Sequence, residues 1–202
     1  MLSRTAWRVP ALATASAALA LAPAAVWAHA DGHVGGGFVA GLLHPISGLD
    51  HVVAMVAVGL WGAVLGPPAV WVLPVAFPLV MAFGGLLGLL GVPIPGVEIG
   101  IALSGLVMGL MVLFELRPPL WLAALIVSAF AVFHGHAHGA ELPAGGNALL
   151  YSLAFVIATG LLHLLGIALG ETRRWPGGRR FVQAGGGVVA LIGLWFLEQA
   201  LQ

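Results

Sequence analysis

The chain has 202 residues, of which 61% are hydrophobic and only 7% charged, and its formal net charge is zero. A soluble protein of this size cannot bury so much apolar surface, so the composition and the mean hydropathy of +1.10 predict an all-α integral membrane protein in contact with the lipid bilayer. Zero net charge and the lack of Lys argue against a basic nucleic-acid face, and the lack of Cys excludes disulfides, iron–sulfur clusters and thiolate metal sites.

The N-terminal residues have the pattern of a secretory signal peptide. Arg4 and Arg8 precede an Ala/Leu-rich core over 11–25, and small residues then offer cleavage after Ala28 or after Ala30. We predict a signal peptide over residues 1–28, which places the mature N-terminus outside the cytoplasm. An uncleaved anchor helix is the alternative.

The mature chain, residues 29–202, is predicted to be one domain of six transmembrane helices. Each candidate is close to the roughly 20 apolar residues that a helical span requires, and Gly/Pro-rich breaks separate them. The candidates are 37–65, 68–91, 97–115, 119–138, 147–170 and 181–200.

The arginines predict the orientation of these spans. Arg117 lies between the third and fourth candidates, and four more arginines lie over 173–180, between the fifth and sixth. By the positive-inside rule these two connections are cytoplasmic. With six spans, both mature termini then lie outside, in agreement with the signal peptide.

The first span contains a polar motif, His-Pro-x-x-Gly-x-Asp-His, over residues 44–51. Ionisable groups in a span mark an ion or substrate path by default. On a straight helix His44 and His51 are two turns apart on one face, about 10 and 20 Å below the outer end of the span. Asp50 points toward a neighbouring helix, and Met55 follows His51 on the same face as a thioether ligand. The proline and glycine predict a kink or an unwound turn. An Asp–His pair that merely joins helices is the alternative.

The fourth span ends in a second motif, Phe-His-Gly-x-Ala-His-Gly-x-Glu, over residues 133–141. His134 and His138 are i, i+4 neighbours, and Glu141 follows on the same face, which is a spacing by which helices present metal ligands. His136 points away from that face and is the weakest candidate. An exposed His-rich loop that scavenges cations is the other interpretation.

Four further residues complete the set of candidate metal ligands. His163 lies inside the fifth span among leucines, either as a ligand or as a hydrogen-bonded interior residue. Glu98 begins the third span, as a carboxylate at the mouth or as a complement to the helix dipole. His29 and His33 lie near the mature N-terminus, where they either capture metal or belong to a disordered tail. Together the candidates form a gradient from the surface to the interior.

At residues 44–51 and 133–141 the sequence resembles the HupE/UreJ family of nickel/cobalt permeases, and the resemblance extends over essentially the whole chain. It implies nickel uptake for hydrogenase or urease maturation. It also implies functional roles for the matching residues, which are His44, Asp50, His51, His134, His138 and Glu141.

The residues and the resemblance together predict a bacterial inner-membrane protein that transports Ni²⁺ or Co²⁺ from periplasm to cytoplasm. We expect no enzymatic activity and no resident cofactor, since the metal is the transported substrate. A membrane metalloenzyme with a histidine-rich centre and a metal sensor or chaperone without transport are the alternatives. The choice of metal, the energy coupling and a homo-oligomeric state are left open by the sequence.

Overall fold

The computed structural model describes residues 34–141 and 147–202 of the chain, and in this part the regular structure is entirely helical. The predicted signal peptide and the candidates His29 and His33 lie outside the described residues. The helices are α1 (Val34–Ser47), α2 (Leu49–Leu65), α3 (Ala69–Leu89), α4 (Val97–Leu113), α5 (Leu120–Ala140), α6 (Ala148–Glu171) and α7 (Gly178–Ala200), with a short 3₁₀ turn at Thr172–Arg174.

Four helices, α3, α5, α6 and α7, are long and apolar enough to cross a membrane. A fifth crossing is available if α1 and α2 are counted as one broken span, and α4 is a shorter apolar helix of 17 residues. The structure therefore describes a multi-pass helical membrane protein with four to five candidate spans, whereas the predicted number of six remains a prediction.

The first predicted span is not a straight helix. It breaks at Gly48, and the segments Gly37–Ser47 and Leu49–Leu65 meet at 79°. The Ser47 hydroxyl donates to the His44 carbonyl at 2.7 Å, and the Gly48 carbonyl accepts the Val52 amide as α2 begins. The predicted kink is thus present, but the expectation that His44 and His51 share one face of a continuous helix is wrong.

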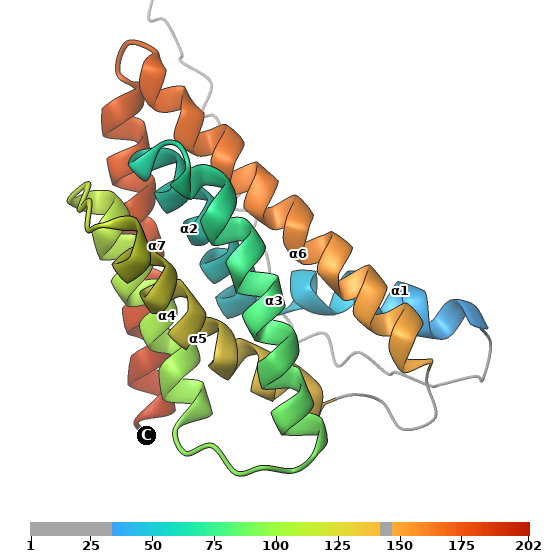
Figure 1. The fold of residues 1–202 in the computed structure, drawn as a ribbon. Helices are drawn as coiled ribbons and strands as arrows, with labels where there is room; N and C mark the ends of the chain where they lie inside the picture. The colour runs from blue at the N-terminus through green and yellow to red at the C-terminus, as the bar shows by residue number, and fades with distance from the viewer. Residues whose placement is uncertain (1–33, 142–146) are drawn as a thin grey trace, which may run out of the picture.

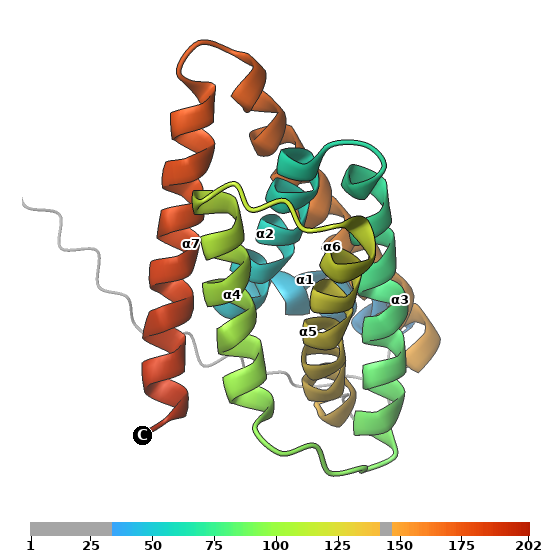
Figure 2. The same ribbon diagram turned by 60° about the vertical axis from the view of Figure 1, so that its left-hand side comes forward.

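The helices pack in pairs, α3 with α5, α4 with α7, and α6 with both α2 and α1. Figures 1 and 2 show the α2–α3, α4–α5 and α6–α7 connections at one end of the bundle, and the α3–α4 connection and the C-terminus at the opposite end. The arginines of the described residues all lie in or beside the first set of connections, which we call the arginine end.

Glycines allow close approach between α3 and α5. A Cβ atom at Gly135 would collide with the Met81 carbonyl, and one at Gly139 with the Gly85 carbonyl. Both glycines belong to the second polar motif. Their lack of a side chain therefore fixes how near the α5 histidines lie to the rest of the bundle.

A candidate metal-transport site between two helix groups

Four histidine rings lie in a row, which we call the histidine row, in the order His44, His138, His51 and His134. The successive ring centroids are 4.9, 4.2 and 4.7 Å apart. Side chains separated by up to 94 residues in the sequence thus make one continuous line of imidazoles. Exposure falls along it, because His44 is half-buried, whereas His134 is fully buried.

The row is assembled from two helix groups in alternation. His44 lies on α1 and His51 on α2, both in the group that packs on α6, whereas His138 and His134 lie on α5, in the group with α3. His134 and His138 share one face of α5, as their i, i+4 spacing predicts, and both rings lie against His51. The break at Gly48 separates His44 from His51 so that the His138 ring neighbours both.

At its exposed end the row forms an outer trio of His44, His138 and Glu141, whose donor atoms all lie within 4.8 Å of one another. His44 Nε2 is 3.3 Å from a Glu141 carboxylate oxygen. With metal–donor bonds of about 2.1 Å, two ligands at right angles around an ion are about 3 Å apart. The trio therefore has the donor types of a site for a borderline divalent ion, and its His44–Glu141 pair has nearly the required spacing.

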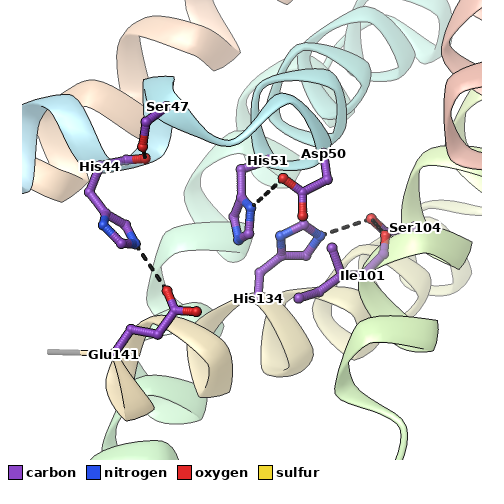
Figure 3. A network of polar contacts seen from close by, with 8 residues as sticks. All are labelled: His44, Ser47, Asp50, His51, Ile101, Ser104, His134 and Glu141. Atoms are coloured by element: carbon purple, nitrogen blue, oxygen red, sulfur yellow. Dashed lines mark hydrogen bonds and ion pairs between the residues drawn. The ribbon is translucent and has the colours of Figure 1, made fainter. Parts of the chain in front are cut away.

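The Asp50 carboxylate determines which nitrogen of His51 is free. Its Oδ1 is 3.0 Å from His51 Nδ1, and since an ionised carboxylate only accepts, Nδ1 carries the proton (Figure 3). The Nε2 atom of His51 is then left with a lone pair, and it is buried without a hydrogen-bond partner among the described residues. Asp50 thus orients the His51 ring, and a carboxylate in this position is the usual second partner of a metal-binding imidazole.

Ser104 on α4 does the same for His134, and nothing in the sequence pattern singles it out beyond its isolation in an apolar helix. Its hydroxyl donates to the Ile101 carbonyl at 2.6 Å and lies 2.8 Å from His134 Nε2 (Figure 3). Because the single hydroxyl proton is already used, His134 Nε2–H is the donor. Its Nδ1 is then a free acceptor, and it too is buried without a partner in the described chain.

Both ring nitrogens of His138 are likewise buried and have no hydrogen-bond partner among the residues described. A buried polar atom left without a partner costs about 1–3 kcal/mol. Three adjacent rings, those of His51, His134 and His138, have four such nitrogens between them. Packing alone gives no compensation for this free-energy cost. An exchanging cation, or the water that accompanies it, would satisfy them.

The remaining candidates are placed outside the row. His136 Nε2 donates to the Val92 carbonyl at 2.7 Å, in the α3–α4 connection and away from the row. Met55 is fully buried in the hydrophobic core. Glu98 is exposed and shares a cavity of about 210 Å³ with Asp50, between α2, α4 and α7. Glu98 therefore lies on the Asp50 side of the row and not beside Glu141.

Beyond His134 the row is interrupted by Phe77 of α3, which sequence reasoning did not identify. Its fully buried ring lies 5.6 Å from the His134 ring and 5.4 Å from the His163 ring, centroid to centroid. His163 is therefore the innermost candidate, separated from the row by one aromatic ring. The rings at the inner end, His134 and His163, are buried, and the order of the rings follows helix packing rather than distance along a straight first span; the gradient of metal ligands remains a prediction.

Comparison with known proteins gives the same relationship over nearly the full length. The model of the family described as HupE/UreJ protein matches residues 17–196. The chain is 49% identical to Protein HupE of Rhizobium leguminosarum bv. viciae over 182 residues, which cover 90% of this chain and 94% of that protein. No solved structure matches it. The chain therefore belongs to the HupE/UreJ family.

Proposed function

We propose that this protein carries Ni²⁺, or Co²⁺, across the bacterial inner membrane into the cytoplasm, for delivery to hydrogenase or urease maturation. The histidine row with its unpartnered buried nitrogens carries the proposal. Membership of a family associated with nickel and cobalt uptake supports it. The family is one of transporters rather than enzymes, so the metal is treated as cargo.

The proposed path begins at the carboxylates. Glu141, which is exposed, would attract the hydrated cation to the outer trio, which would replace part of its water shell, and Glu98 would attract cations on the Asp50 side of the row. His51 Nε2 and His134 Nδ1 would receive the ion next, because their lone pairs are the ones left free by Asp50 and Ser104. Neighbouring sites of this kind keep each binding step weak enough for release.

The proposed topology has six spans after a cleaved signal peptide, with α1 and α2 as one broken span, α4 as a short one, and both mature termini in the periplasm. The concentration of arginines at one end supports a cytoplasmic location for that end. An inward-negative potential of about 100 mV then contributes about 4.6 kcal/mol to the entry of a divalent ion. That driving force requires no coupled solute.

The test is potential-driven uptake of labelled nickel by vesicles containing the purified protein, comparing wild type with Asp50→Asn. An amide can donate to His51 Nδ1, which turns the proton onto Nε2 and removes the lone pair from the row. We expect uptake to fall about 10- to 100-fold, the usual effect of losing such a partner. Glu171→Gln, which alters a carboxylate at the arginine end, is the matched control and keeps wild-type uptake.

Equal uptake by wild type and Asp50→Asn would exclude the proposed role of the histidine row. The same vesicles separate the alternative functions, since an enzyme would turn over an organic substrate and a sensor or chaperone would bind nickel without flux. Competition by cobalt, zinc and copper then gives the metal preference, which the nitrogen and oxygen donors leave open.

A further inference from the structure

Two polar side chains of α6 are buried deep in the membrane-spanning part of the bundle. His163 is 1% exposed and Thr159 is fully buried. Both ring nitrogens of His163 and the Thr159 hydroxyl are without a hydrogen-bond partner among the described residues. Because the two residues are i, i+4 neighbours, their side chains lie on the same face of α6. Three unsatisfied polar atoms on one buried face destabilise a helix bundle, and apolar packing does not compensate for that cost.

The helix opposite supplies backbone oxygen at the same level. Pro74 and Pro78 lie inside α3, and a proline lacks the amide that would bind the carbonyl four residues earlier. Pro78 therefore leaves the Pro74 carbonyl without its helical partner, and this carbonyl approaches the His163 ring without meeting the distance and angle of a hydrogen bond. Freed carbonyls at a helix irregularity are a recurrent source of cation ligands within membranes.

The position of this group along the path is fixed by its neighbours. Phe77 lies between His163 and the histidine row, with the ring of His163 in edge contact at 5.4 Å. A Cβ atom at Gly59 of α2 would collide with the His163 carbonyl, so α2 and α6 are held in direct backbone contact there. His163 lies about 22 Å along α6 from Ala148 and about 12 Å from Glu171, hence closer to the arginine end.

We propose that His163, Thr159 and the Pro74 carbonyl form a second, inner binding site for the transported divalent cation, between Phe77 and the arginine end. The inference rests on the proposed function. One imidazole with neutral oxygen donors binds a borderline cation more weakly than the outer trio with its carboxylate. The inner site is therefore suited to accept the ion after the row and to release it onward.

The test compares wild type, His163→Asn and His163→Cys in vesicles, with labelled nickel and an inward-negative potential. Asn fills the space and forms hydrogen bonds but is a poor ligand, whereas Cys is smaller and binds transition metals as a thiolate. We expect at least a tenfold loss of flux for Asn and retention of flux for Cys, with stronger competition by zinc because the thiolate is a softer ligand. Leu164→Ala, on the exposed face of α6, is the control for packing changes.

Each result bears on the inner site separately from the general function. Wild-type vesicles without nickel flux would contradict the proposed function itself. Wild-type flux accompanied by normal flux in His163→Asn would overturn the inner site alone. If His163→Asn fails to assemble, His163→Cys still decides, since unchanged competition by zinc would show that residue 163 does not touch the ion.

Discussion

Residue-level chemistry determines which atoms of the row are available to a cation. The two rings nearest its buried end each have one nitrogen occupied, His51 by Asp50 and His134 by Ser104. The occupied atoms differ, Nδ1 in His51 and Nε2 in His134, so the free atoms differ too. This orientation of the rings is invisible in the sequence spacing, because it depends on a serine contributed by another helix.

We predict that Ser104→Ala weakens nickel binding about tenfold, which corresponds to about 1.4 kcal/mol. Without the hydroxyl, His134 Nε2–H is buried without an acceptor, and the ring no longer prefers the tautomer that exposes Nδ1. Equilibrium binding of labelled nickel to the detergent-purified protein measures the change. Ser128→Ala, a serine on α5 in the same chemical class, should bind as wild type, and equal affinity for both variants would contradict a positioning role of Ser104.

The carboxylate of Glu141 gives a second prediction at the residue scale. Glu141→Gln removes the negative charge from the outer trio while preserving the side-chain length, so the first capture of a hydrated cation weakens. We expect the nickel concentration for half-maximal uptake to rise by about tenfold, with a smaller change in the maximal rate. Rate-against-concentration curves in vesicles test this, and an unchanged half-maximal concentration would place capture elsewhere.

At the scale of elements, the break between α1 and α2 brings the two ends of the first motif onto either side of His138. Pro45 and Gly48 predict that some break occurs, and it does. They do not predict its angle of 79°, because the direction of α1 is set by packing against α6, where a Cβ atom at Gly41 would collide with the Tyr151 backbone. Pro45 and Gly48 are thus enough to predict that the helix breaks, but not where the break places His44 relative to His51.

Gly48→Ala should impair transport without unfolding the protein. Its backbone has an extended conformation that alanine can adopt, but the new Cβ would lie 2.9 Å from Asp50 Oδ1 and 3.2 Å from His51 Nδ1. Both side chains must then move, and we expect a several-fold loss of nickel uptake with a normal thermal unfolding midpoint. Gly187→Ala, whose Cβ would meet only ordinary contacts, serves as the comparison.

Gly135→Ala should act on stability instead. The added Cβ would be forced against the Met81 carbonyl, so α5 must separate from α3. We expect destabilisation of about 1–3 kcal/mol, the usual cost of overpacking, together with reduced uptake because His134 and His138 move with α5. Thermal unfolding in detergent, followed by tryptophan fluorescence, gives the first quantity. Gly185→Ala, with open space at its Cβ, should unfold as wild type.

For the whole molecule, the proposed orientation in the membrane rests on the arginine distribution and can be tested directly. The chain has no cysteine, so single cysteines can be introduced as accessibility probes without background. We expect a membrane-impermeant maleimide to label Val92→Cys and Gln202→Cys in intact cells with a permeabilised outer membrane. Trp175→Cys should react only after lysis. Labelling of Trp175→Cys in intact cells would contradict the proposed topology and indicate the opposite orientation.

Features set by residues close together in the sequence can be predicted from it, whereas contacts between distant helices cannot. Helical content, a multi-pass fold and the shared face of His134 and His138 follow from local composition and spacing, and the structure agrees with them. The insertion of the His138 ring between His44 and His51, and of Phe77 between His134 and His163, requires knowledge of which helices touch. No periodicity in a single sequence contains that information.

The alternation of the row between two helix groups has a mechanical consequence. On the proposed function, an ion held by adjacent rings would be bound to both groups at once, so its arrival would tighten the contact between them and its departure would loosen it. Occupancy of the row by the cation and the rigidity of the contact between the two helix groups would then change together. A cation that binds too tightly would hold the two helix groups together and so slow its own release.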